Sequence, residues 1–135
     1  MVAPKSTEAN VAWGSYGITR GTVNTTNGLA NTDTLASRGS SVTTGHPSAY
    51  TAKNLTTGGY NTWYMPAIQE LITLYSNQSK TPFASANGFL SSTRYWSSTE
   101  VDANNAINLA WWTGAQSNSL KYNPMYSRAV RRSTI

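Results

Sequence analysis

The chain has 135 residues, of which 39% are hydrophobic and only 11% are charged, and it contains no cysteine. This length predicts a single domain over residues 1–135, with residues 1–10 as a candidate flexible arm. The lack of cysteine excludes disulfides, thiolate metal sites and a cysteine nucleophile. No stretch has the length of a membrane span or the apolar core of a signal peptide, so neither membrane insertion nor a signal peptide is expected.

The net charge of +5 is concentrated near the C-terminal end. Residues 103–135 carry no acidic side chain and four basic ones, at Lys121, Arg128, Arg131 and Arg132. Two interpretations stay open: these side chains attract an anionic polymer, or they line a solvated edge strand and prevent edge pairing. The basic residues are too few, and they are not interleaved with aromatic ones in any known pattern of a nucleic-acid reader, so nucleic acid is not the expected partner.

The first strand is predicted over residues 11–18, where glycines stand at places that allow the backbone to bend. Residues 22–45 follow as a stretch of Thr, Asn, Ser and Gly with few sizeable apolar side chains. A segment of this length without an element of its own is usually functional or held by its own packing. We therefore expect a long loop here.

Two helices are predicted next, each begun by a proline whose missing N–H costs nothing at that position. The first spans residues 47–55. Its residues expected in the core are Ala49, Tyr50 and Ala52. The second follows Pro66 and carries one apolar stripe with the spacing i, i+3, i+4 and i+7. The stripe consists of Ile68, Leu71, Ile72 and Tyr75.

From residue 95 onward the pattern has the period of two that is typical of strands. Four strands are predicted, at residues 95–99, 106–112, 119–122 and 127–132. In the second of these, Trp111 shares a face with Leu109 and is expected in the core, whereas Trp112 shares the other face with Asn108. The order of elements predicts an α+β domain with two helices, an antiparallel sheet and long loops.

Four segments combine characteristic residues in an order and spacing that span nearly the whole chain. They are Trp13-Gly14, Trp63–Pro66 with Glu70-Leu71, Tyr95–Glu100 and Arg128–Arg131. Together they resemble the family named for the C-terminal domain of the Legionella collagen-like adhesin, a branch of the C-type-lectin-like fold. The resemblance implies paired N- and C-terminal strands below a region of long loops. It also implies a non-enzymatic domain of bacterial surface, phage virion or tail-fibre proteins that binds polymers or surface glycans.

The motif residues fit a role in the frame of the domain. The indole N–H groups of Trp63 and Trp96 each need a buried partner, which Ser and Thr hydroxyls can supply. A buried carboxylate can be held by a guanidinium through two hydrogen bonds. The expected pairs join Glu70 and Glu100 to Arg128 or Arg131.

Residues 100–105 offer oxygen donors of the kind that a hard cation such as calcium requires, and Glu100 and Asp102 are the weak metal candidates. The Glu-Pro-Asn and Gln-Pro-Asp tripeptides of glycan-binding lectins with this fold are absent, so we expect no cofactor, with calcium as the alternative. His46 is the only histidine and is expected to cap a helix or face solvent. Neither a nucleophile elbow nor a distinctive carboxylate pair is present, so no enzymatic activity is expected.

The late hairpin and the loop after it combine aromatic rings with amide and hydroxyl groups, a mixture typical of binding loops. Aromatic rings stack on sugar faces, while the polar groups bind the ring substituents. The candidate ligand-binding residues are Trp112, Gln116, Asn118, Lys121, Tyr122, Asn123, Tyr126, Asn104 and Asn105. Tyr122 and Tyr126 have a second interpretation as packing residues.

These observations favour a binding domain associated with a phage virion or fibre that recognises a host-surface glycan or an anionic polymer. The alternative is a structural virion protein that decorates a capsid and contacts neighbouring subunits. Either role predicts a homo-oligomer, with a trimer as one option, or assembly with virion proteins. The expected location is a virion or an extracellular surface.

Overall fold

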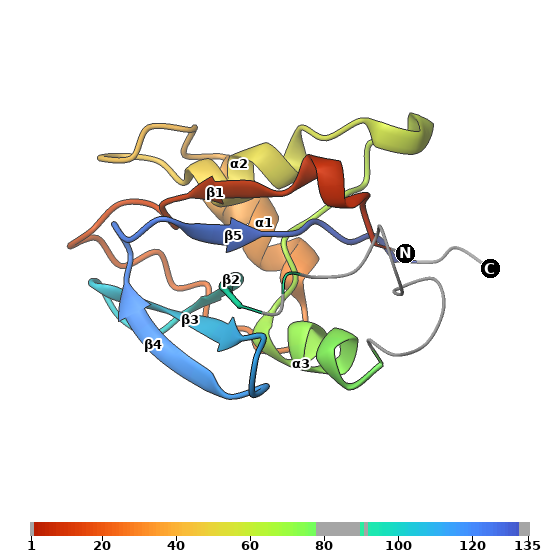
Figure 1. Ribbon diagram of the computed structural model, residues 1–135. Helices are drawn as coiled ribbons and strands as arrows, with labels where there is room; N and C mark the ends of the chain where they lie inside the picture. The colour runs from red at the N-terminus through yellow and green to blue at the C-terminus, as the bar shows by residue number, and fades with distance from the viewer. Residues whose placement is uncertain (1, 78–89, 91, 133–135) are drawn as a thin grey trace.

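In the computed structural model, which describes residues 2–77, 90 and 92–132, a twisted five-stranded sheet has helices on both faces (Figure 1). The strands are β1 (Ala9–Val11), β2 (Arg94–Glu100), β3 (Asn105–Ala110), β4 (Gln116–Leu120) and β5 (Met125–Ser127). The helices are α1 (Gly28–Ala36), α2 (Pro47–Lys53) and α3 (Ile68–Ser76), with 3₁₀ turns at Lys5–Thr7 and Thr57–Gly59. The α+β class is confirmed, although the helices number three in this part of the chain and two were predicted.

The first strand pairs with the last, as the resemblance implied. The sheet order is β1-β5-β2-β3-β4, and β1 runs antiparallel to β5 with Ala9 opposite Ser127. Ahead of β1, the Ala3 N–H donates to the Ala129 carbonyl over 3.0 Å. These contacts bond the segment from Val2 to β1 into the domain. β5 lies parallel to β2, and β2, β3 and β4 form an antiparallel meander.

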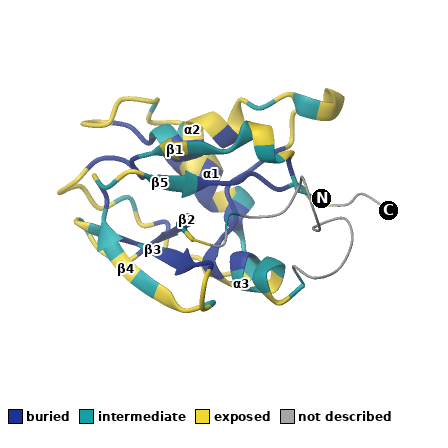
Figure 2. Cartoon of the chain, viewed as in Figure 1, coloured by how far each residue is buried: buried dark blue, intermediate teal, exposed yellow. Residues whose placement is uncertain are grey.

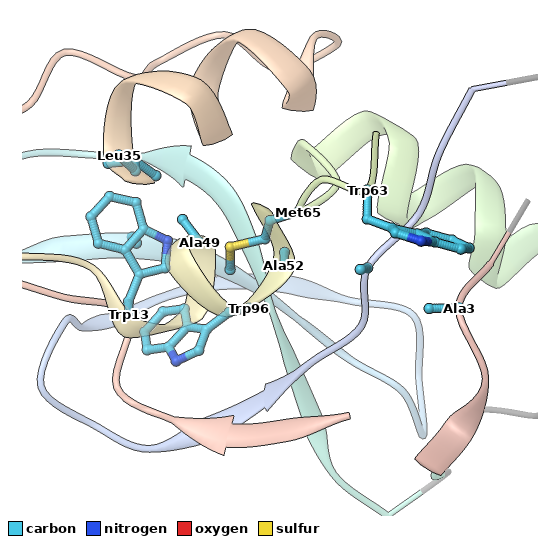
Figure 3. Close-up of a cluster of buried hydrophobic side chains, with 10 residues drawn as sticks. Ala3, Trp13, Leu35, Ala49, Ala52, Trp63, Met65 and Trp96 are labelled. Carbon is cyan, nitrogen blue, oxygen red and sulfur yellow. The ribbon is translucent and has the colours of Figure 1, made fainter. Parts of the chain in front are cut away.

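Alternation along β2 divides the core between the two faces of the sheet. Trp96 belongs to a cluster with Leu35 of α1 and Ala49 of α2 (Figure 3). Its neighbour Tyr95 belongs to a second cluster, with Leu71 of α3. Helices α1 and α2 therefore cover one face of the sheet, and α3 covers the other.

Helix α1 lies inside the polar stretch that was predicted to be a loop. The Asn27 side chain caps it by accepting a hydrogen bond from the Ala30 N–H, and Leu35 is fully buried. The Thr32 hydroxyl also bonds both the N–H and the carbonyl of Met65. The helix is thus held by a cap and by tertiary hydrogen bonds in place of a broad apolar stripe.

The other elements occur where they were predicted but with different bounds. Helices α2 and α3 are confirmed, yet Tyr50 is 39% exposed because the face of α2 that packs on the core carries alanines. Each of the four late strands that were predicted overlaps an observed strand, but the bounds differ: β2 and β4 are longer than predicted, whereas β3 and β5 are shorter, and β5 begins two residues earlier. The predicted first strand is wrong beyond Val11. Residues 12–18 form a loop there, anchored by the Trp13 indole, which donates to a β2 carbonyl over 2.7 Å.

The indole N–H groups do not use the expected hydroxyl partners. Trp63 donates to the backbone carbonyl of Thr57 over 3.1 Å. The indole nitrogen of Trp96 is fully buried and has no hydrogen-bond partner within the part of the chain that the structure describes. The prediction of hydroxyl partners is therefore wrong for Trp63, because a turn carbonyl lies within reach.

The buried carboxylates also have partners other than those predicted. Glu70 accepts hydrogen bonds from the backbone N–H groups of Gly28 and Ala67, at 2.8 and 3.1 Å. The guanidinium of Arg128 forms an ion pair with Glu8 at 2.7 Å, in an environment where both side chains are almost fully buried. Charged side chains of the core thus join segments that are remote in the sequence.

Candidate ligand-binding site

A row of polar side chains crosses three neighbouring strands on the sheet face that also carries Trp96. Arg94 of β2 donates from Nη1 to Asn108 Oδ1 over 3.0 Å and to Ser117 Oγ over 2.8 Å. Asn108 of β3 donates in turn from Nδ2 to Ser119 Oγ over 2.7 Å. The β2–β3 and β3–β4 register places these residues beside one another, so the strands themselves fix the row.

Trp112 lies two residues after the end of β3, and its ring is next to Arg94 of this row. Its side chain is 51% exposed, whereas the preceding Trp111 is buried against α3. The guanidinium carbon of Arg94 lies 4.9 Å from the Trp112 ring centroid, a cation–π distance. The exposed Trp112 ring thus lies next to the Arg94 guanidinium, which hydrogen bonds to β3 and β4 hold in place.

The Trp112 site opens into a pocket of about 340 Å³ between the start of β2 and the start of β5. Its lining residues are Asn10, Ser92, Thr93, Arg94, Trp112, Pro124, Met125 and Tyr126. An aromatic ring, a guanidinium and several hydroxyl and amide groups therefore converge on one hollow. Such a set can stack on an apolar ring face and bind hydroxyl or acidic substituents around it.

The structure separates the predicted binding residues into several groups. Trp112 and Tyr126 line the same pocket. Gln116 and Asn118 are exposed, but alternation along β4 directs them to the face opposite Ser117. Asn123 is partly exposed in the turn after β4.

Tyr122 belongs to a different surface from Trp112. Its ring makes an edge contact with Tyr16 at 5.1 Å between centroids, and the two rings line a pocket of about 420 Å³ with Val42. Asn104 lies in the β2–β3 turn and Asn105 begins β3, and the backbone N–H groups of both donate to Asp102. These hydrogen bonds lower the pKa of the Asp102 carboxyl. Asp102 is thus engaged in a turn.

Lys121 is not a surface residue, which corrects the prediction that it contacts ligand. Its side chain is fully buried, and Nζ pairs with Glu100 Oε2 at 2.7 Å and donates to the Ile18 carbonyl over 2.9 Å. The Glu100 carboxylate also accepts from the backbone N–H groups of Arg20 and Gly21. Glu100 is therefore saturated by protein donors, and this removes it as an accessible calcium ligand.

The basic C-terminal segment divides between core and surface. Lys121 and Arg128 are buried in ion pairs, so neither the anion-attracting nor the edge-guarding interpretation applies to them. The guanidinium of Arg131 lies over the ring of Tyr60 at 3.6 Å, next to a pocket of about 240 Å³. Arg132 is exposed and lies over the Tyr64 ring.

Sequence reasoning missed Arg94 and the Ser117–Ser119 pair, although one signal pointed to the row. Asn108 and Trp112 share a face by alternation, which pointed to the row, although the Asn108 side chain itself is fully buried. Arg94 comes from a strand that only the register brings alongside. Within residues 2–77, 90 and 92–132, no helix is long and apolar enough to cross a membrane, and no cluster of three metal-ligating side chains occurs.

His46 is fully buried at the start of α2, in place of the predicted capping or solvent-facing role for its side chain. Its Nε2 accepts a hydrogen bond from Arg20 Nε at 3.1 Å. Burial, together with the nearby Arg20 and Lys121 cations, lowers the pKa of His46 to about 4. The neutral imidazole therefore accepts a hydrogen bond that holds the loop around Arg20 against the start of α2.

Comparison with solved structures finds a similar fold in the crystal structure of a fimbrial protein from Bacteroides ovatus, with a TM-score of 0.62 and 18% sequence identity. The similarity covers 90% of this chain and 33% of that chain, so this chain spans about a third of the fimbrial protein's length. A search of curated protein sequences gives no significant match. The sequence model of the Lcl C-terminal domain matches residues 6–131, and the chain therefore belongs to the Lcl C-terminal domain family.

Proposed function

We propose that this protein is a non-enzymatic, adhesin-type binding domain that recognises a surface glycan or an anionic polymer through the Trp112 site. The observation that carries the proposal is the half-exposed Trp112 ring held beside Arg94 at the mouth of a pocket. Family membership and the fimbrial structure of similar fold support a role at an extracellular surface.

The chemistry of the site fits a saccharide better than an apolar ligand. Trp112 supplies a flat apolar surface for a sugar ring, and Arg94, Ser92 and Thr93 supply polar groups in the same pocket. The hydrogen bonds from Arg94 to Asn108 and Ser117 hold the guanidinium in place. Within the described ranges, Arg94 uses only Nη1 in hydrogen bonds, so Nε and Nη2 keep donors for a ligand. A guanidinium with two remaining donor groups suits a carboxylate or sulfate substituent.

The carrier that we propose is a phage virion or fibre, or another extracellular assembly, since the resemblance points to bacterial surface and phage-particle proteins. No cofactor is part of the proposal. The second candidate, a structural decoration protein, would use the same loops for contact with neighbouring subunits.

Binding of the purified protein to an array of bacterial surface glycans, sulfated polymers and uronic-acid polymers tests the proposal. We expect Trp112→Ala to weaken binding about tenfold or more, because exposed aromatic anchors carry much of such binding energy. Tyr50→Ala is the matched control, since it removes an exposed ring on α2, away from the pocket. Arg94→Gln should reduce binding to acidic polymers more than to neutral glycans and lower the salt dependence.

Equal binding by the wild type and Trp112→Ala would contradict the assignment of the site. If no saccharide binds and Trp112 is buried against neighbouring proteins in an isolated particle, the structural role replaces the binding role. Cross-linking of particles followed by mass spectrometry separates these outcomes, because it identifies the proteins in contact with the Trp112 loop.

A further inference from the structure

Strand β4 forms one border of the sheet, and its outer edge carries backbone groups that no other strand of residues 2–77, 90 and 92–132 uses. Hydrogen bonds from Ala110 N to Ala115 O and from Lys121 N to Asn104 O, both 2.9 Å, fix the phase of the ladder with β3. Odd-numbered residues of β4 bond to β3, so the N–H and C=O groups of the even-numbered residues point away from the sheet. The even-numbered residues are Gln116, Asn118 and Leu120.

This edge lacks the features that usually prevent pairing between sheets. Exposed edges are normally blocked by charged side chains, proline, bulges or very short strands. Strand β4 has five residues, Gln116–Leu120, with no charge and no proline, and its register with β3 is continuous. The opposite border, β1, has only three residues and directly follows Glu8. Figure 2 shows β4 as exposed and intermediate along its whole length.

The sequence of β4 is close to a palindrome about its central residue. Gln116-Ser117-Asn118-Ser119-Leu120 reads as polar, serine, asparagine, serine, then leucine. In an antiparallel pair of two β4 strands centred on Asn118, each asparagine faces its copy and Ser117 faces Ser119. A surface that is complementary to itself in this way is what a twofold-symmetric dimer requires.

We propose that two copies of this chain pair along β4, antiparallel about Asn118, and join their sheets into one. The Asn118 N–H groups then donate to the opposite Asn118 carbonyls, and the Leu120 N–H groups donate to the opposite Gln116 carbonyls. The Leu120 carbonyl already accepts from the Asn123 N–H at 3.0 Å, so each of the two outer Leu120–Gln116 pairs contributes one hydrogen bond, from the Leu120 N–H. The charge of +5 repels two copies in general, but no charged side chain of β4 opposes the approach.

The pairing has a geometric consequence for the Trp112 site, which rests on the proposed function. A twofold axis normal to the sheet keeps the same face of both copies on the same side. Two Trp112 sites would then face one surface, and a weak single-site affinity would gain from bivalent attachment. Because pairing of one edge strand buries less area than a standard interface, the dimer should form only at high local concentration.

Sedimentation velocity from micromolar to near-millimolar protein tests the pairing directly. The wild type should shift reversibly from monomer to dimer, and Asn118→Lys should stay monomeric because two cations would meet on the twofold axis. Ser76→Lys, which places the same charge on the exposed end of α3, should dimerise like the wild type. Amide exchange gives a measurement without mutation: the Asn118 and Leu120 amides should become protected as concentration rises.

A wild type that remains monomeric at the highest concentration would overturn the proposal, even if its β4 edge captured a strand from another protein. A trimer would overturn it too, as would equal dimerisation of Asn118→Lys and the wild type. If monomeric protein does not bind glycan, the proposed function is contradicted and the pairing is not. If the protein binds glycan at a single site but does not dimerise, the pairing is contradicted and the proposed function is not.

Discussion

Buried charges in this protein fix loops in place. The Glu100–Lys121 pair is inaccessible to solvent, and Glu100 also receives two backbone N–H groups from the loop at Arg20 and Gly21. A buried charge is tolerated only when its partners replace the lost water. Here the backbone of a loop is among those partners, so the ion pair orders the loop at the same time. The same loop carries Arg20, whose side chain binds His46.

His46 predicts an acid-dependent loss of stability. Its pKa is about 4 in the folded protein, below the value of about 6.5 expected in the unfolded chain. Between pH 6.5 and pH 4 the unfolded state gains a proton that the folded state does not bind. The free energy of unfolding should therefore be fully retained above pH 6.5 and fall by ~1.4 kcal/mol per pH unit in that window. Urea denaturation at several pH values measures the slope.

His46→Gln is the matched variant, because its amide oxygen can still accept from Arg20 and it does not titrate. Its stability should depend less on pH between 6.5 and 4 than that of the wild type. Parallel curves for the two proteins would show that His46 does not contribute to the acid sensitivity. Any pH dependence of the unfolding free energy that remains in the variant comes from the carboxylates.

At the scale of elements, the N-terminal ends of α1 and α3 lie against each other. A Cβ atom on Gly28 would lie 2.5 Å from the Met65 carbonyl oxygen. The start of α1 can therefore lie this close to the Met65 backbone only because residue 28 is glycine. The Glu70 carboxylate bridges the gap: Oε1 accepts from the N–H groups of Gly28 and Ala67, and Oε2 accepts from the Tyr64 hydroxyl. One side chain thus caps two helices.

Replacement of Glu70 by alanine should destabilise both helix starts. The N–H of Gly28 would lose its acceptor, and a hydrogen bond to a charged group contributes ~1.5–3 kcal/mol. We expect a loss of about that size in the free energy of unfolding, measured by chemical denaturation. Gln69→Ala changes the exposed neighbouring residue on α3 and should have little effect. Equal stability of the two variants would show that the bridge is not a stabilising contact.

Helix α3 was predictable and α1 was not, for a physical reason. The apolar stripe of α3, with Ile68 and Leu71 fully buried, is a pattern within one segment. The stabilising contacts of α1 run instead to residues far along the chain, such as the hydrogen bonds between Thr32 and Met65. Propensity and periodicity describe local preferences, and tertiary hydrogen bonds override them where polar residues dominate.

At the scale of the whole molecule, the strand order explains which parts of the site could be predicted. Alternation along the predicted strand 106–112 was enough to assign Trp111 to the core and Trp112 to the surface. The neighbour of Trp112, Arg94, lies on β2, and the pocket is completed by Tyr126 of β5. β5 lies parallel to β2 by a long-range pairing, and no periodicity along the chain specifies such a neighbour.

The closure between the chain ends depends on one buried carboxylate. Glu8, ahead of β1, pairs with Arg128 after β5 at 2.7 Å and accepts a hydrogen bond from the Tyr95 hydroxyl at 2.6 Å. Arg128 also donates from Nε to the Ala3 carbonyl over 2.6 Å. This arrangement connects the N-terminal segment, the last strand and the centre of the sheet. Burial and the hydrogen bond to Glu8 raise the pKa of Tyr95, which keeps its hydroxyl protonated.

Glu8→Gln should therefore destabilise the whole domain. Breaking a buried ion pair by removing one of its two charges costs ~3–5 kcal/mol. Asp33→Asn is the control, since its ion pair with Lys53 is about half exposed and should contribute no more than ~1 kcal/mol. Denaturant unfolding gives both values, and amide exchange of β1 shows whether the N-terminal segment detaches first. If the two variants lose similar amounts of unfolding free energy, the buried Glu8–Arg128 pair contributes no more to stability than an exposed ion pair.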